Sequence, residues 1–209
     1  MFKVKVRATL LALALPLLLN ATHILKDDIL KIEASQLINE MGDELFSKTG
    51  INGYVIATNE RFPVGFNLVE YSKKYEKHMS KPYVLFIFAP QARITEQTDT
   101  KGRVGLIPSS EAIRHLYDYD DVRDAAVDVV STQDKNSDED KHNIGVIQAF
   151  SELAEGIAKS KGVELTKTIS NDTRYMVWGL SVLVYIGSLL VLWLFILRPL
   201  YMRIKHGKK

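Results

Sequence analysis

The sequence predicts an α/β protein in which a small mixed β-sheet carries helices on both faces, followed by one C-terminal transmembrane helix. Three observations lead to this prediction. Residues 83–88 are almost continuously apolar, as expected of a central strand that is covered on both faces. Amphipathic helical patterns occur on both sides of this strand in the chain. Residues 176–197 contain no charged side chain.

The apolar stretches at the two ends of the chain differ in length and context. Residues 176–197 would form roughly 33 Å of helix, which is enough to cross a hydrocarbon core of ~30 Å. Residues 8–19 are too few to do so; they follow three basic residues and lead to Ala21. This pattern is typical of a secretory signal peptide that is cut after Ala21. We therefore expect the chain to be exported and then retained by its C-terminal helix.

The distribution of charge predicts the orientation. Basic residues follow the second apolar stretch: Arg198, Arg203, Lys205, Lys208 and Lys209. The positive-inside rule places this tail in the cytoplasm. The whole chain carries +2, the first 21 residues carry +3 and the tail carries +5, so residues 22–197 carry −6. An acidic exported part disfavours a nucleic-acid partner, because phosphate binding needs a basic face.

These features divide the chain into five segments. They are a signal peptide (1–21), a periplasmic domain (22–162), a juxtamembrane tether (163–175), the transmembrane helix (176–197) and a basic cytoplasmic tail (198–209). The chain contains no cysteine, which excludes disulfides, cysteine catalysis and thiolate metal sites. An exported domain of this size without disulfides favours a bacterial inner membrane with the domain in the periplasm.

Periodicity and turn residues predict the elements of the domain in order. The first half contains a helix at 29–48 that Asp27 or Asp28 caps and Gly50 ends, a strand at 54–58, a loop at 59–66, a helix at 67–80 that Pro82 follows, and the apolar strand at 83–88. The second half contains a turn at 89–91, an antiparallel strand at 93–98, a short strand at 103–107, and helices at 109–116, 121–130 and 143–161, the last ended by Gly162.

This order of elements resembles the TPM domain family over about residues 26–161. The family leads from its first helix into a strand through a Thr-Gly step, which here is Thr49-Gly50 before Tyr54. It then has an apolar strand that ends in Ala-Pro, which here is Ala89-Pro90. The resemblance implies the TPM fold. It also implies a role in the assembly, repair or regulation of membrane complexes, or a phosphatase activity.

An acidic segment near residue 134 is the first candidate for a metal site. Oxygen ligands occur at alternate positions in Asp134, Asn136 and Asp138, followed by Asp140, as at the start of a calcium-binding loop. The loop lacks the glycine and the bidentate glutamate of that motif, since Glu139 and Gly145 occupy those positions. The competing interpretation is a solvated loop that caps the next helix, with no cofactor bound.

A second acidic cluster lies shortly before the first. It includes Asp120 and Asp124, and Asp120 or Asp121 is expected to cap the helix at 121–130. Joined with the first cluster, it could hold a divalent ion for phosphate-ester hydrolysis. The five histidines show no i, i+4 pair, which argues against a transition-metal enzyme. Neither a nucleophile elbow nor a phosphate-binding glycine loop is present, so no strong catalytic motif supports an enzyme.

The predicted membrane helix carries a polar and aromatic stripe. Its members recur at helical spacing with a glycine beside them: Trp178, Ser181, Tyr185, Gly187 and Ser188. Small and hydroxylated residues favour packing against another helix in lipid. The alternative is an inert anchor in which the tryptophan marks the interface and the serines bond their own helix.

Together these patterns predict a non-enzymatic accessory factor, an assembly factor or chaperone. It would bind and stabilise a polytopic inner-membrane complex, such as a respiratory or flagellar-motor complex, through its span and its periplasmic domain. The alternatives are a metal-dependent periplasmic phosphatase and a calcium-sensing module, both of which would use the acidic loops.

Overall fold

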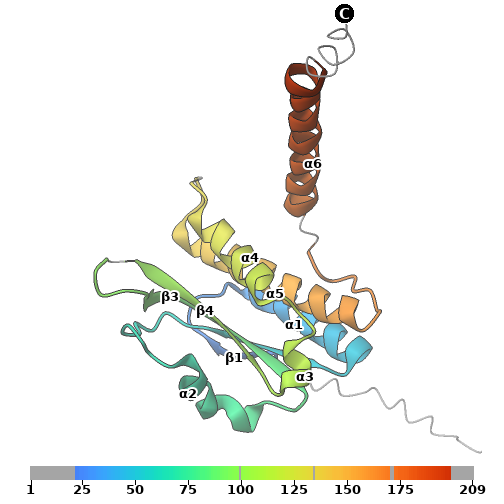
Figure 1. Cartoon of the computed structure of the whole chain (residues 1–209). Helices are drawn as coiled ribbons and strands as arrows, with labels where there is room; N and C mark the ends of the chain where they lie inside the picture. The colour runs from blue at the N-terminus through green and yellow to red at the C-terminus, as the bar shows by residue number, and fades with distance from the viewer. Residues whose placement is uncertain (1–21, 99, 134, 170–171, 199–209) are drawn as a thin grey trace, which may run out of the picture. The chain divides into compact units, whose positions relative to one another are not determined.

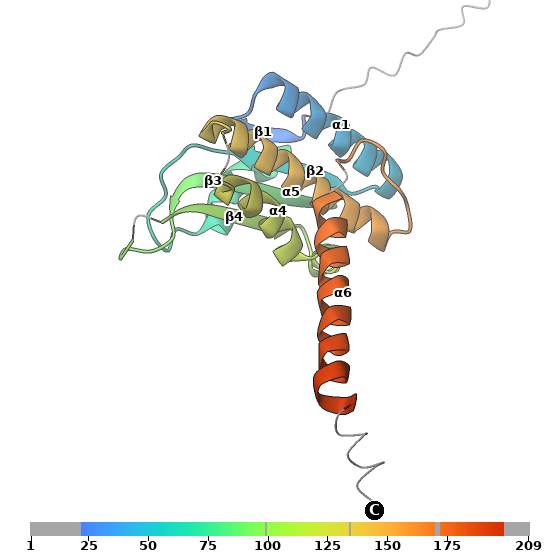
Figure 2. The same cartoon turned by 90° about the horizontal axis from the view of Figure 1, so that it is seen from above.

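The computed structural model describes residues 22–98, 100–133, 135–169 and 172–198 (Figures 1 and 2). The chain divides into two compact units, Met1–Thr168 and Ile169–Lys209.

A four-stranded mixed sheet organises the first unit. Its strands lie in the order β1 (Ile24–Asp27), β2 (Asn52–Ala57), β3 (Tyr83–Arg93) and β4 (Lys101–Pro108). β1, β2 and β3 are parallel, and β4 runs antiparallel to β3. The predicted α/β class with a mixed sheet is therefore confirmed.

Helices cover both faces of this sheet. They are α1 (Ile32–Thr49), α2 (Leu68–Ser72), the 3₁₀ helix η1 (Lys73–His78), α3 (Glu111–Arg114), α4 (Tyr119–Ser131) and α5 (Asp138–Ser160). Figure 1 shows α1, α4 and α5 over one face and α2 beneath the other. Two separate apolar clusters fill the space between the sheet and each layer of helices.

Strand β3 contributes to both clusters. Val84, Phe86 and Phe88 point towards α1, α4 and α5, whereas Leu85 and Ile87 point towards α2. Successive side chains of a strand face opposite sides of the sheet, so a strand that is apolar at every position needs cover on both. The prediction that residues 83–88 form a covered central strand is confirmed.

The structure corrects the predicted strands in two places. Strand β1 was not predicted from the sequence. The predicted turn at 89–91 and the predicted strand at 93–98 are both wrong, because β3 continues to Arg93 and pairs with β4. Pro90 is tolerated because the pairing with β2 ends at Phe88 and the register with β4 is irregular between Ala89 and Arg93.

Several helix boundaries also differ from the prediction. α1 begins at Ile32, and Asp27 accepts a hydrogen bond from the Leu30 N–H instead of capping the helix itself. The predicted helix at 67–80 is split into α2 and η1. α5 begins at Asp138, five residues before the predicted start, and only four residues of 109–116 form α3. The predicted ends at Gly50 and Gly162, both with positive φ, are confirmed.

The buried side chain of His23 holds the first described residues against the rest of the domain. The ring of His23 bonds the Gly53 carbonyl through Nδ1 at 2.7 Å and reaches the Asp43 carboxylate through Nε2 at 3.2 Å. Helix α1 passes so closely that a Cβ at Gly42 would lie 2.4 Å from the ring. The fold therefore incorporates the chain from His23 onwards, two residues after the predicted cut.

Part of the predicted tether is docked on α1. The Glu44 carboxylate accepts hydrogen bonds from the backbone N–H groups of Thr166 and Lys167, at 2.9 and 2.8 Å, and from the Thr166 hydroxyl. Lys48 forms an ion pair with the same carboxylate at 2.8 Å. Burial would raise the pKa of Glu44, but these partners outweigh it and lower the pKa to about 2.

The second unit contains helix α6 (Asp172–Leu192), which continues as the π-helix η2 (Trp193–Leu197). Within the part of the chain that the structure describes, no helix is long and apolar enough to cross a membrane. The transmembrane helix at 176–197 therefore gains no support from the structure and stays a prediction.

Replacing Glu44 with glutamine tests the docked segment. The folded pKa of Glu44, about 2, lies below its ordinary value of 4.5, so its contribution to stability is present above pH 4.5 and is lost as the pH falls towards 2. We expect Glu44→Gln to lower the free energy of unfolding by about 1–3 kcal/mol at pH 7. Chemical denaturation of both proteins between pH 7 and pH 3 should show this difference shrinking below pH 4.5.

The matched control is Glu33→Gln, since Glu33 is exposed in the first turn of the same helix. It should cost little at any pH. A Glu44→Gln penalty that stays constant from pH 7 to pH 3 would contradict the assignment.

Candidate functional site

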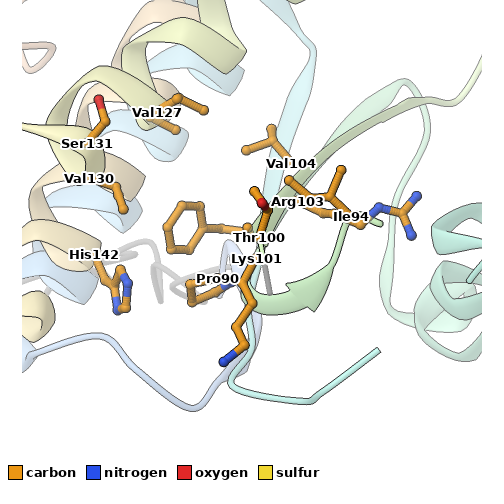
Figure 3. A pocket seen from close by; sticks show the side chains of 13 residues that line it. Pro90, Ile94, Thr100, Lys101, Arg103, Val104, Val127, Val130, Ser131 and His142 are labelled. Atoms are coloured by element: carbon orange, nitrogen blue, oxygen red, sulfur yellow. The ribbon is translucent and has the colours of Figure 1, made fainter. Parts of the chain in front are cut away.

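An open apolar groove lies between helix α4 and the β3–β4 hairpin (Figure 3). Its volume is about 380 Å³. The floor is formed by Phe88 and Val104, which are paired across β3 and β4. Val127 and Val130 of α4 form one wall and face Val104 across the groove (Figure 3). The remaining lining comes from Pro90, Ile94, Thr100, Lys101, Gly102, Arg103, Ala126, Ser131 and His142.

Two apolar side chains of the groove are exposed to solvent. Val127 is 46% exposed and Ile94 is 47% exposed. Burying apolar surface stabilises an association by about 25 cal/mol per Å². An apolar concavity with open walls is thus suited to receive apolar side chains of another molecule.

His142 of α5 closes one end of the groove. Its ring packs edge-on against Phe88, with the ring centroids 5.7 Å apart. Burial lowers the pKa of His142, and the nearby Asp138 carboxylate only partly opposes this. The imidazole is therefore neutral at pH 7, and the groove keeps its apolar character.

A polar hollow of about 380 Å³ adjoins the groove and shares His142 with it. Its other lining residues are Asp28, Ile29, Leu30, Asn59, Gln91 and Glu139. Asp28 directly follows β1 and Asn59 lies two residues after the end of β2, so this hollow lies at the carboxyl edge of the parallel strands. Ligands of open α/β sheets commonly bind at that edge.

The Asp28 carboxylate beside this hollow is already engaged in a polar network. Asp28 accepts hydrogen bonds from the Thr58 hydroxyl at 2.8 Å and the Asn59 N–H at 3.2 Å, and it pairs with Lys26 at 3.1 Å. Burial alone would raise the pKa of Asp28, but these partners lower it. Glu60 extends the network by binding Lys26 and accepting from the Tyr71 hydroxyl. Asp28 is thus held ionised in a role that fixes the ends of β1 and β2.

The first acidic cluster acts mainly as a helix cap. Ser137 caps α5 by accepting from the Asp140 N–H at 3.1 Å, and its hydroxyl donates to Asp140 Oδ2 at 2.7 Å. Lys31 binds the other oxygen of Asp140 at 2.6 Å, and the pKa of Asp140 is lowered by Lys31 and by Ser137. Asp138 lies in the first turn, where negative charge is favourable. Asn136 precedes the helix, and Asp134 lies outside the described residues.

The second acidic cluster also has structural partners. Asp118, and not Asp120 or Asp121 as predicted, caps α4 by accepting from the N–H groups of both. Arg123 pairs with two other carboxylates of the cluster, at 2.7 Å from Asp120 and 2.8 Å from Asp124.

The structure does not bring the two clusters together. α4 and α5 form an antiparallel pair. At one end Lys141 donates to the Thr132 carbonyl at 2.6 Å, and at the other Ser160 donates to the Leu116 carbonyl at 2.8 Å. The first cluster lies at the Thr132 end and the second at the Leu116 end, about one α4 length (~20 Å) apart. Among the described residues, no group of three or more acidic or histidine side chains could hold a metal ion.

The predicted stripe on the C-terminal helix is described only in part. The side chains of Trp178 and Ser181 lie outside the described ones. Tyr185 is exposed, and Ser188 donates to the carbonyl of Val184 in its own helix at 2.8 Å. A shallow hollow passes over Gly187 and Ser188 on the same helix. Packing against another helix stays a prediction.

Scans of this sequence against protein-family models and against characterised proteins return no match. The resemblance to the TPM family therefore stays a prediction from the residues quoted above.

The groove was not predicted from the sequence. Its lining comes from β3, β4, α4 and α5, which are distant in the chain. One signal was available in α4, where Val127 widens the apolar stripe beyond the positions that pack on the core, Val122, Ala125, Ala126 and the partly buried Val130. An apolar stripe wider than its core contact indicates a second contact surface.

Thr58→Val tests the polar network beside the groove. The substitution keeps the shape of this buried side chain and removes the hydroxyl that binds Asp28. We expect a loss of about 1–3 kcal/mol in the free energy of unfolding, because the partly buried carboxylate loses a donor. Denaturant titration measures it, with Thr98→Val as control, since Thr98 is exposed in the β3–β4 loop and its hydroxyl pairs with the exposed hydroxyl of Thr100. A penalty no larger than that of the control would show that the network is not structural.

Proposed function

We propose that this chain is a non-enzymatic accessory factor, an assembly factor or chaperone, of a polytopic bacterial inner-membrane complex. A C-terminal helix anchors it in the inner membrane, with the α/β domain in the periplasm and the C-terminus in the cytoplasm. The observation that carries the proposal is the open apolar groove between α4 and the β3–β4 hairpin. Its exposed valine and isoleucine side chains suit the binding of a protein surface.

The anchor in this proposal rests on the sequence. Residues 176–197 lack charge, and basic residues follow them. Tyr185, Gly187 and Ser188 would meet membrane helices of the client, together with Trp178 and Ser181. The resemblance to TPM domains supports the same role, and a respiratory or flagellar-motor complex is an example of such a client.

The contacts of the acidic loops support a role in helix capping and ion pairing rather than in metal binding. Both oxygens of Asp140 have partners, and Arg123 pairs with Asp120 and Asp124. A phosphatase or a calcium sensor would need these carboxylates for a metal ion. The accessory factor needs them only for the stability of α4 and α5.

A pull-down from cells tests the proposal. The tagged full-length chain is purified in mild detergent, its partners are identified by mass spectrometry, and the membrane proteome of a deletion strain is compared with that of the parent. We expect one polytopic complex to co-purify and to be depleted in the deletion strain. No stable partner and an unchanged proteome would refute the proposal.

Variants locate the contact. Val127→Glu, at a side chain that is 46% exposed, should reduce the recovered client by about tenfold or more, because a carboxylate would be buried in the complex without a partner. The matched control is Val69→Glu, since Val69 is 54% exposed on α2 at the opposite face of the sheet.

Asp134→Ala with Asp138→Ala should leave the client bound, whereas these changes would abolish a phosphatase or a sensor. A plain leucine-rich span should weaken client binding but spare an enzyme.

A further inference from the structure

Strand β4 is an edge of the sheet in the described part of the chain, since β3 is its only neighbour there. All of its residues are exposed or half-buried. An edge strand presents backbone N–H and C=O groups that can pair with another chain. Which of its residues present them follows from the register of β3 and β4.

The register shows that Val104 and Leu106 turn their backbone groups outward. The Ser109 N–H donates to the Tyr83 carbonyl at 2.8 Å, and the Tyr83 N–H donates to the Ser109 hydroxyl at 2.9 Å, so these two residues form a hydrogen-bonded pair across the strands. Hydrogen-bonded pairs alternate with non-bonded pairs along an antiparallel ladder. The backbone N–H and C=O groups of Ile107, Gly105 and Arg103 therefore point towards β3. The intervening residues, Val104 and Leu106, then face away from the sheet.

A contact of Tyr119 independently supports the outward direction of the Val104 backbone groups. Its hydroxyl donates a hydrogen bond to the Val104 carbonyl at 3.2 Å, which requires that carbonyl to point outward. Tyr119 thus occupies the place that a backbone donor of an added strand would take.

Two hollows lie along this edge with the spacing of a strand. Val104 lines the apolar groove, and Leu106 lines a second hollow of about 380 Å³ with Pro108, Arg114, His115, Tyr117, Asp118 and Tyr119. Val104 and Leu106 are two residues apart, about 6.7 Å along the strand. Alternate side chains of a strand paired with β4 have the same spacing, so they would enter the two hollows in turn.

The charge along the edge is opposite to that of the exported part as a whole. The two hollows are lined by the cations Lys101 and Arg114 and by one carboxylate, Asp118, which caps α4; Arg103 also borders the groove, but its guanidinium points away from it and donates to the Phe66 carbonyl at 2.7 Å. Residues 22–197 together carry −6. The local excess of positive charge suits a partner segment that carries carboxylates.

We propose that the outer edge of β4 binds an extended peptide segment of the partner by strand addition, with alternate apolar side chains in the two hollows and acidic side chains between them. Main-chain bonds give such a complex its affinity, and the hollows select the side chains. The site rests on the proposed function only in that the segment belongs to the client complex.

Peptide binding to the full-length chain in mild detergent tests the site. The probe is a fluorescent eight-residue peptide of alternating valine and glutamate, measured by anisotropy. In antiparallel addition the valine N–H groups bond Val104 and Leu106. N-methylation of the valines should therefore weaken binding by about tenfold, whereas N-methylation of the glutamates should change it little. No binding of the parent peptide, or equal effects of the two modifications, would overturn the proposal.

Two variants of the chain should act in opposite directions. Val104→Pro removes an N–H that the sheet does not use, and edge strands tolerate proline, so binding should weaken about tenfold. Tyr119→Phe releases the Val104 carbonyl and should tighten binding about threefold. A Tyr119→Phe protein that binds no better, together with a folded Val104→Pro protein that binds as the parent does, would overturn the proposal.

The remaining outcomes separate this site from the proposed function. Sedimentation that detects a dimer abolished by Val104→Pro, with no peptide binding, would assign the edge to a second copy of the chain and overturn the peptide. A client recovered in the pull-down without peptide binding would refute the β4 site and leave the accessory factor standing. Peptide binding without a recovered client would refute the accessory factor and leave the β4 site standing.

Discussion

Burial of β3 on both faces is the constraint on which the rest of the domain depends. A run of apolar residues at every position cannot leave either face in water. β3 therefore lies between two apolar clusters, one beneath α1, α4 and α5 and the other above α2. β2 pairs with it in parallel on one side and β4 antiparallel on the other. Because β4 has no second neighbour in the described part of the chain, the same arrangement that buries β3 leaves an edge open.

Local patterns were sufficient to predict most elements of the fold. The apolar run of β3, the helical stripe of α1 and the glycine ends at Gly50 and Gly162 are each determined by nearby residues. β1 was missed because its four residues, ILKD, carry two charges and owe their position to pairing with β2. Pro90 was interpreted as a turn because the sequence does not show that β2 ends before it.

The acidic segments show why local patterns mislead about function. Alternating oxygen ligands before a helix resemble a calcium loop, but the same residue types also cap helices. In the structure, Ser137 and Asp140 form a capping pair and Asp118 caps α4. The groove could not be predicted from local patterns, because Phe88, Val104 and Val127 meet only when β3, β4 and α4 pack together. The outward direction of the Val104 backbone groups also depends on the register between β3 and β4, which cannot be read from the sequence.

Crosslinking in living cells tests the central claim that the groove side of the domain binds a membrane complex. A photoreactive amino acid is placed at Val127 in the full-length chain and, as a control, at Val69 on the opposite face of the sheet. The expected result is a crosslink from position 127 to one polytopic inner-membrane protein that position 69 does not form. Equal crosslinking from both positions, or none to a membrane protein from position 127, would contradict the claim.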